Sequence, residues 1–369
     1  MLLHSETFMS APYSVTRLLG LGLTPGKLRG LQRISNPNGT LTMVATDQNS
    51  SMISMMKKAT GKDPTYAEVA DAKVMLSRAL SPHCSGLLVD GYYGYFSTVA
   101  ANAVPASTGL LIRVEKSGAA KNAAGAPCGE VEPGWGVSKI KRCGADAVKL
   151  LAQFEPAEFD SAERNFEFTK QIYNACIDND ILFLLEPIHF PYNGEDAKSD
   201  SVVKRKASTV IESARILSRY CDVYKSEFPG TTGVETDAQL TDNLKRLTDA
   251  CTKPWVLLSA GVDYPQYKKQ VEMAMKAGAS GVLGGRAFWK EFFTFVSPAE
   301  RQKFAETECV KRVQEIDEIV KSATPWYKVY GYTADDLKEM RAAEGWHARY
   351  GGGTASTSGP GKADPNAVY

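Results

Sequence analysis

The segment ADAVKLLAQFEPAEFDSAERNFEFTKQIYNACIDNDILFLLE (residues 145–186) contains one complete unit of the pattern that predicts the fold. Its ends, Ala145–Leu151 and Ile181–Glu186, are short apolar runs typical of buried strands, and Asn165–Asn179 between them has the length and period of a helix. A strand, a helix and a second strand in this order predict two parallel strands joined by a helical crossover.

The same alternation continues over residues from about 40 to 290. Six more strands are expected at Leu41–Thr46, Gly86–Asp90, Gly109–Val114, Asp222–Ser226, Trp255–Ser259 and Ser280–Gly284. Nearly continuous apolar runs are typical of a sheet that helices cover, because both of its faces are buried. Eight units predict an α/β protein with a (β/α)8 TIM barrel. A doubly wound open sheet is the alternative, but no GxGxxG motif follows the first strand.

Segments outside this alternation are expected to surround the barrel. The predicted organisation is an N-terminal helical extension (1–38), the barrel (39–292), C-terminal helices packed on the barrel (293–349) and a flexible tail (350–369). The extension has a helical stretch at Ser14–Arg33, and the C-terminal helices are expected at Pro298–Lys321 and Thr333–Ala343. The Gly/Ser-rich tail lacks apolar periodicity. A long loop is expected at Lys116–Gly136, which is rich in Gly, Ala and Pro.

Composition excludes several classes of protein. The 369 residues include 43 Lys and Arg against 42 Asp and Glu, and a net charge of +1 argues against a nucleic-acid partner. No apolar run approaches the roughly 18 to 20 residues of a membrane span. Seven scattered cysteines without a CxxC pair predict no disulfide framework, and four histidines at no metal-ligand spacing predict no metal site. We expect a cytoplasmic protein with no membrane association and no cofactor.

Two lysines occur within predicted strands. The active site of a TIM barrel lies at the carboxyl ends of its strands. The lysines are Lys149 in DAVKLL and Lys225 in DVYKSE, with one strand between them. Because a buried lysine needs a partner, the two are expected to face a shared polar mouth. A lysine beside a second cation has a lowered pKa, and a neutral amine can attack a carbonyl to form a Schiff base. The alternative is two structural lysines, each paired with a carboxylate.

Carboxylates end two of the strands. Glu186 follows the very apolar run ILFLL, a position suited to proton transfer, and it is also placed to neutralise Lys149 or Lys225. Asp47 follows the first strand and either caps the next helix or orients substrate hydroxyls.

Small residues follow the last two strands, as SAG (Ser259–Gly261) and GGR (Gly284–Arg286). Glycine lets backbone N–H groups approach an anion, and arginine adds a planar contact to phosphate. Barrels often hold a phosphate at these two strand ends. The alternative is that both segments are only tight turns, for which glycine is the usual residue.

These residues lie in blocks that resemble a known family, the class I (Schiff-base) aldolases of the tagatose 1,6-bisphosphate aldolase family, which includes the sulfofructose-phosphate aldolases. The matching blocks are ATDQ (45–48), LSPHCSGLLVDGYYG (80–94), GADAVKLL (144–151), FLLEPI (183–188), DVYKSEFP (222–229), PWVLLSAGVD (254–263) and AGASGVLGGRAFW (277–289). They occur in family order.

The resemblance implies a role for each matching residue. Lys225 is implied to be the Schiff-base lysine, Glu186 the general acid and base, and Lys149 a second active-site lysine. The implied substrate contacts are Asp47 and Gln48 for hydroxyl groups and Ser259, Gly261, Gly285 and Arg286 for an anion. One departure is present, because the family often has DQR where this chain has Asp47, Gln48 and Asn49.

The reaction implied by the resemblance is cleavage of a ketose 1,6-bisphosphate of the tagatose type. Its products are dihydroxyacetone phosphate and glyceraldehyde 3-phosphate, formed through a lysine Schiff base without a metal. One alternative is cleavage of sulfofructose 1-phosphate to dihydroxyacetone phosphate and sulfolactaldehyde. Another is a non-catalytic barrel that binds a sugar phosphate. The expected partner is a small-molecule sugar phosphate, and a homo-oligomer is compatible with the added C-terminal helices.

Overall fold

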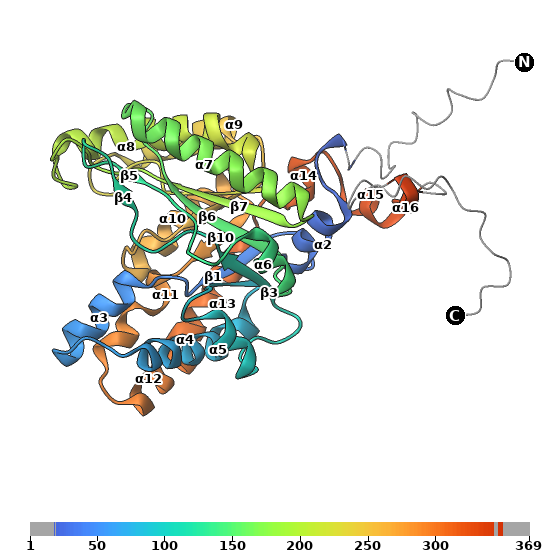
Figure 1. Cartoon of the computed structure of the whole chain (residues 1–369). Helices are drawn as coiled ribbons and strands as arrows, with labels where there is room; N and C mark the ends of the chain where they lie inside the picture. The colour runs from blue at the N-terminus through green and yellow to red at the C-terminus, as the bar shows by residue number, and fades with distance from the viewer. Residues whose placement is uncertain (1–17, 19, 343–345, 350–369) are drawn as a thin grey trace, which may run out of the picture.

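The computed structural model describes residue 18, residues 20–342 and residues 346–349. Its centre is a closed barrel of eight parallel strands (Figure 1). The strands are β1 (Leu41–Ala45), β2 (Gly86–Asp90), β3 (Gly109–Arg113), β6 (Ala147–Gln153), β7 (Leu182–Ile188), β8 (Val223–Ser226), β9 (Trp255–Leu258) and β10 (Gly281–Gly284). Each strand pairs with the next along the chain, and β10 pairs with β1. The predicted TIM barrel is confirmed.

Two strands end beyond the predicted residue. β6 runs to Gln153 instead of Leu151, and β7 runs to Ile188 instead of Glu186. The two strands pair over their whole length, and Ala152 lies opposite Pro187. Proline at this position does not end the strand, so Glu186 lies inside β7 instead of at its end.

Helices surround the barrel between its strands. They are α3 (Ser50–Thr60), α4 (Tyr66–Leu80), α5 (Tyr95–Ala100), α6 (Val137–Arg142), α7 (Phe159–Asp178), α8 (Asp200–Leu217), α9 (Asp237–Ala250) and α10 (Tyr264–Lys276). Two helices, α3 and α4, connect β1 to β2. The predicted loop before α6 contains a short antiparallel pair, β4 (Ala120–Lys121) and β5 (Pro127–Cys128).

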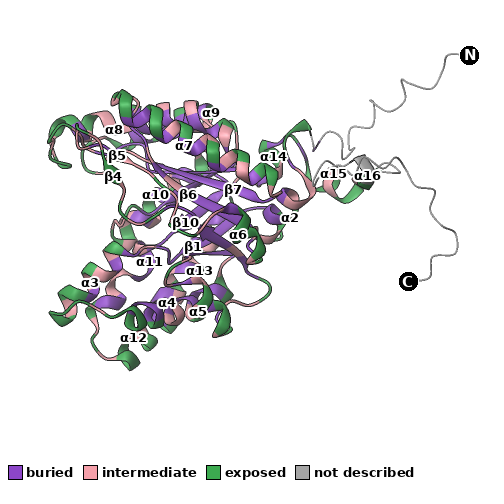
Figure 2. Ribbon diagram, viewed as in Figure 1, coloured by how far each residue is buried: buried purple, intermediate pink, exposed green. Residues whose placement is uncertain are grey.

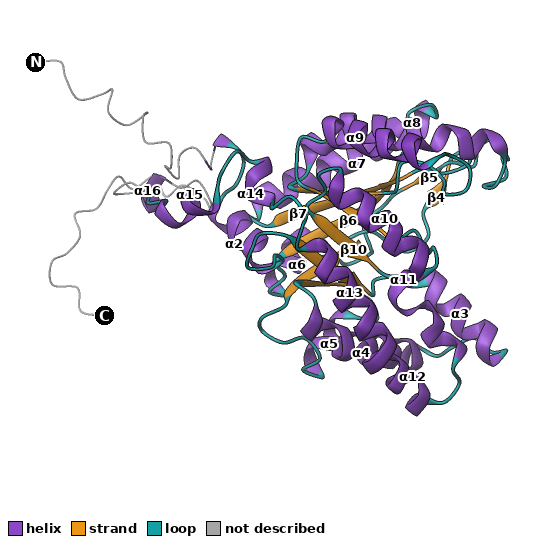
Figure 3. Ribbon diagram, turned by 180° about the vertical axis from the view of Figure 1, so that it is seen from behind, coloured by secondary structure: helices purple, strands orange, loops and turns teal. Residues whose placement is uncertain are grey.

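The C-terminal helices pack on the barrel wall. The helix expected over 298–321 consists of α12 (Pro298–Phe304), a π-helical turn (Ala305–Cys309) and α13 (Val310–Val320). α13 lies against α10, α4 and β1. The rear view shows α13 beside α10 and α4 (Figure 3). Thr42 on β1 donates a hydrogen bond of 2.6 Å to Asp317 on α13. α11 (Arg286–Trp289) precedes this group, and α14 (Trp326–Val329), α15 (Ala334–Glu339) and α16 (Trp346–Arg349) follow it.

The amino end of the barrel is closed by α2 (Pro25–Arg33) and α14, which Figure 1 places side by side at one end of the molecule. Leu31 and Trp326 are buried in the same apolar cluster as the inward side chains of the strands. Residues 14–17 of the helical stretch expected in the extension lie outside the described residues, as does the predicted tail. The division into extension, barrel, C-terminal helices and tail stays a proposal.

The strands of the barrel are largely buried (Figure 2). Side chains that alternate along them belong to two apolar clusters. One set of positions fills the barrel and includes Met43, Leu111 and Leu184, and the opposite set packs against the surrounding helices and includes Val44 and Phe183. Because side chains two apart share a face, the inward set also decides which residues reach the carboxyl end of the barrel.

Two further expectations concern the chain as a whole. None of the helices in the described part of the chain is long and apolar enough to cross a membrane. All seven cysteines are free thiols.

Candidate active site

On three strands the inward-facing residue that follows the apolar interior, two positions further along the strand, is charged. Lys149 follows Ala147 on β6 by two residues, Glu186 follows Leu184 on β7, and Lys225 follows Val223 on β8, so all three point to the same side of the wall. They line a cavity of about 350 Å³ at the carboxyl ends of the strands. Strand alternation therefore brings together side chains that are far apart in the sequence.

Glu186 lies between the two lysines. Its Oε1 is 2.7 Å from Lys225 Nζ, and its Oε2 is 2.9 Å from Lys149 Nζ. The three residues are 7%, 3% and 1% exposed, in the order Glu186, Lys225, Lys149. The Glu186 carboxylate on β7 thus contacts two buried ammonium groups, one from each of the two strands beside β7.

Lys149 has two further carboxylate partners. Its Nζ is 2.8 Å from Glu115 Oε1 and 3.1 Å from Asp47 Oδ2. Burial alone lowers the pKa of Lys149, but Asp47, Glu115 and Glu186 outweigh that effect and raise the pKa above its ordinary value. The expectation that a second cation lowers the pKa is wrong for Lys149, because three anions surround this ammonium group.

The pKa values of the other two carboxylates in contact with Lys149, Asp47 and Glu115, are shifted in opposite directions. Burial opposes the charge of Asp47, yet Lys149, Lys225 and Arg113 together hold its pKa well below the usual range. Burial raises the pKa of Glu115, and Lys149 and Arg113 offset it only in part. The interpretation of Asp47 as a helix cap is wrong, because α3 begins after Asn49 and the Asp47 carboxylate contacts Lys149.

Three successive carbonyl groups after β1 accept hydrogen bonds from buried cations. Lys73 on α4 donates to the carbonyl oxygens of Thr46 (2.6 Å) and Gln48 (3.1 Å). Arg113 on β3 donates to the carbonyl oxygen of Asp47 at 2.7 Å. Sequence analysis missed Lys73. Its signal is a lysine on the buried face of a helix where most other members are apolar, such as Leu76.

The predicted anion-binding residues lie together at the ends of β9 and β10. The backbone N–H of Gly285 donates to Ser259 Oγ at 3.2 Å. A Cβ on Gly261, which has a φ of +79°, would lie 2.9 Å from Arg286 Cζ, so glycine makes room for the guanidinium group. A Cβ on Gly285 would lie 2.8 Å from Gln48 Nε2. Within the described chain Arg286 makes no ion pair, which leaves its charge available to a ligand.

Eight of the nine predicted site residues line the cavity: Asp47, Gln48, Lys149, Glu186, Lys225, Ser259, Gly285 and Arg286. The ninth, Gly261, lies beside it against Arg286. Asn49, the departure from the family pattern, also lines the cavity. It donates to Asp90 Oδ2 at 3.3 Å.

A further carboxylate at the mouth, Glu227, was not predicted. Glu227 lines the cavity and is two residues beyond Lys225. Its Oε2 accepts from the backbone N–H of His189 and lies 2.8 Å from His189 Nδ1. Burial raises the pKa of Glu227, but the contacts with His189 outweigh it and leave the pKa lowered. No group of three or more His, Cys, Asp or Glu among the described residues is arranged to hold a metal ion.

Fold and site together define a TIM barrel with two buried lysines at its mouth, and comparison with known proteins identifies its family. Residues 41–291 match the family described as DeoC/LacD family aldolase, and the chain belongs to this family. It is therefore an aldolase, a carbon–carbon lyase whose family acts on sugar phosphates.

Two relatives are similar along most of their length. The tagatose 1,6-diphosphate aldolase 1 of Enterococcus faecalis is 31% identical over 317 residues, which cover 80% of this chain and 95% of the relative. The tagatose 1,6-diphosphate aldolase of Lactococcus lactis subsp. lactis is 28% identical over 326 residues, covering 82% and 98%.

Solved structures support the fold. A Schiff base-forming fructose-1,6-bisphosphate aldolase has a TM-score of 0.52 at 15% identity, covering 80% of this chain and 99% of that one. The fructose-bisphosphate aldolase of Plasmodium falciparum has a TM-score of 0.64 at 12% identity, covering 81% and 95%. At these identities the likeness shows the TIM barrel alone.

Proposed function

We propose that this chain is a class I aldolase in which Lys225 forms a Schiff base with the C2 ketone of a ketose phosphate. The proposed substrate is a ketose 1,6-bisphosphate of the tagatose type, the substrate in the names of both relatives. The observation that carries the proposal is the position of Glu186 between Lys225 and Lys149.

The electrostatic difference between the two lysines favours Lys225 as the nucleophile. Lys149 contacts three carboxylates, which stabilise its charged form. Lys225 makes one ion pair within the described chain, with Glu186 at 2.7 Å. Proton transfer from Lys225 Nζ to Glu186 Oε1 yields a neutral amine and a carboxylic acid already in contact. Lys149 then remains a fixed positive charge.

The proposed sequence of steps uses that same proton. The Lys225 amine attacks C2, and Glu186 protonates the carbinolamine hydroxyl, which leaves as water. The resulting iminium ion withdraws electrons from the C3–C4 bond. Glu186, now a carboxylate, removes the proton of the C4 hydroxyl as that bond breaks and the aldehyde leaves. Glu186 returns that proton to C3 of the enamine, which regenerates the iminium ion. Addition of water then releases dihydroxyacetone phosphate and the Lys225 amine.

Binding and orientation are assigned to the remaining cavity residues. The C1 phosphate is proposed to bind Arg286 with the small residues Ser259, Gly261 and Gly285. Asp47 and Gln48 are proposed to contact substrate hydroxyls. Lys149 is proposed to stabilise negative charge that develops on substrate oxygens.

Metal independence is part of the proposal, because the iminium ion supplies the electron sink that a metal would otherwise supply. The proposed ligand is a small sugar phosphate, and association of the barrel into a homo-oligomer stays a prediction.

A substrate panel tests the proposal. Purified protein is supplied with tagatose 1,6-bisphosphate, fructose 1,6-bisphosphate and sulfofructose 1-phosphate, and dihydroxyacetone phosphate is measured, with Lys225→Ala as control. We expect the fastest cleavage with the tagatose compound and no cleavage by the variant. Faster cleavage of the sulfonate identifies the alternative aldolase instead. Binding of every compound without turnover contradicts an enzymatic role.

A further inference from the structure

Lys73 is a buried lysine outside the cavity that the proposed mechanism does not use. It projects from α4, and it is fully buried. Its Nζ lies 2.6 Å from Asp90 Oδ1, and Asp90, the last residue of β2, is fully buried as well. A buried ion pair contributes little to stability on balance, because desolvation of both charges offsets their attraction. Its position next to the active site therefore calls for another explanation.

The two remaining contacts of the Lys73 ammonium reach the segment that follows β1. Thr46 O and Gln48 O accept its hydrogen bonds, at 2.6 Å and 3.1 Å. Between them stands Asp47, whose side chain contacts Lys149. Two carbonyl groups held by one ammonium group fix the backbone on both sides of Asp47, and with it the direction of the Asp47 side chain.

Asp90 extends the same arrangement to the next loop. Its Oδ2 accepts from the backbone N–H groups of Tyr92 (3.1 Å) and Tyr93 (2.7 Å) and from Asn49 Nδ2 (3.3 Å). The pair therefore connects α4 with the segments that follow both β1 and β2. The segment after β1 carries the hydroxyl contacts assigned above and forms one side of the cavity.

We propose that Lys73, paired with Asp90, is a positioning residue that holds Asp47 and Gln48 in the geometry required to bind substrate. The inference rests on the proposed function, since it concerns the same site. Lys73 itself does not line the cavity and acts through the backbone of residues 46–48. Loss of its hydrogen bonds should weaken substrate binding more than it slows chemistry at Lys225 and Glu186, which stand on other strands.

The test replaces Lys73 with a neutral side chain of similar length. For Lys73→Met we expect KM for tagatose 1,6-bisphosphate to rise about tenfold while kcat falls less than threefold, a pattern that indicates lost binding interactions. The Lys225 adduct with dihydroxyacetone phosphate should still be trapped by borohydride. Arg78→Met is the matched control, because Arg78 is an exposed cation of the same helix that donates to a carbonyl away from the cavity, that of Ala101. It should leave KM within twofold.

A double variant separates positioning from stability. Lys73→Met leaves Asp90 buried and unpaired, which lowers the melting temperature, whereas Lys73→Met with Asp90→Asn removes that charge and should recover much of the loss. Under the proposal KM stays raised in the double variant. Recovery of KM together with stability, or an unchanged KM in the folded single variant, overturns the positioning role. Absence of any wild-type adduct instead contradicts the proposed function and the inference with it.

Discussion

Lys225 Nζ lies 2.7 Å from Glu186 Oε1 inside a barrel mouth where both side chains are more than nine-tenths buried. An amine and a carboxylate at this distance exchange a proton without any movement of the backbone. The other oxygen of the same carboxylate contacts Lys149, so Glu186 is the residue through which the two lysines are coupled.

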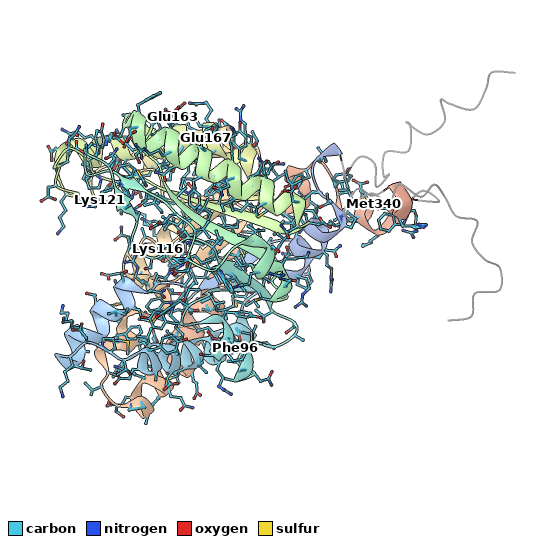
Figure 4. All side chains as sticks on the ribbon, in the orientation of Figure 1. Phe96, Lys116, Lys121, Glu163, Glu167 and Met340 are labelled. Carbon is cyan, nitrogen blue, oxygen red and sulfur yellow. The ribbon has the colours of Figure 1, made fainter. Side chains whose placement is uncertain are left out.

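Glu186→Gln tests that coupling. Glutamine keeps the size of the side chain but cannot accept the Lys225 proton or return it, so we expect kcat to fall roughly 100- to 10,000-fold, the contribution typical of general acid–base catalysis. Steady-state cleavage assays on the folded variant measure it. Glu163→Gln is the matched control, because Glu163 is an exposed carboxylate on α7 (Figure 4), and its kcat should equal that of the wild type. A Glu186→Gln enzyme with more than a tenth of wild-type kcat contradicts the assigned role.

Glu115 predicts a pH dependence of stability. Because burial raises its pKa in the folded state, the folded protein binds this proton more tightly than the unfolded chain does. The free energy of unfolding therefore loses a contribution as pH rises above the ordinary glutamate pKa of about 4.3. Glu115→Gln lacks that loss.

We expect Glu115→Gln to gain stability relative to the wild type as the pH rises from about 4, since the loss in the wild type begins at the ordinary glutamate pKa. Urea denaturation of both proteins across this range measures the difference. For Glu163→Gln the difference from the wild type should stay constant. A stability difference that moves against Glu115→Gln as pH rises would show that Lys149 and Arg113, not burial, dominate at this carboxylate.

Arg286 predicts the behaviour of the phosphate. Removal of its guanidinium group in Arg286→Ala should raise KM for the ketose phosphate at least tenfold, since it removes a charge-assisted contact to the anion. Inorganic phosphate should inhibit the wild type competitively and the variant far more weakly. Arg246→Ala, which removes an exposed arginine on α9, should change neither quantity. Equal inhibition of wild type and Arg286→Ala by phosphate excludes Arg286 from the anion site.

Much of the fold was predictable because each strand and helix carries its own local signal. Apolar runs separated by helical periods give the eight strands, and parallel pairing follows from their alternation. Strand ends were less predictable, since the extension of β7 to Ile188 depends on its pairing with β6 and not on its own residues. The single helix expected over 298–321 contains a π-helical turn that no local pattern announced.

The site was predictable where strand alternation determines it. Lys149, Glu186 and Lys225 converge because each is the next inward position after an apolar one. The role of Lys73 was not predicted, because it depends on a helix that passes close to a loop 25 residues earlier in the chain. The raised pKa of Lys149 was not predicted for a similar reason, since it depends on Asp47 and Glu115 from two other parts of the barrel.

The most direct test of the central claim is borohydride trapping with dihydroxyacetone phosphate, followed by mass spectrometry of the digested protein. We expect one covalent adduct, located on Lys225, formed equally with and without EDTA and absent from Lys225→Met. An adduct on Lys149 would show that Lys149, and not Lys225, is the nucleophile. No adduct on folded, substrate-cleaving protein, or cleavage that EDTA abolishes, would contradict a Schiff-base mechanism altogether.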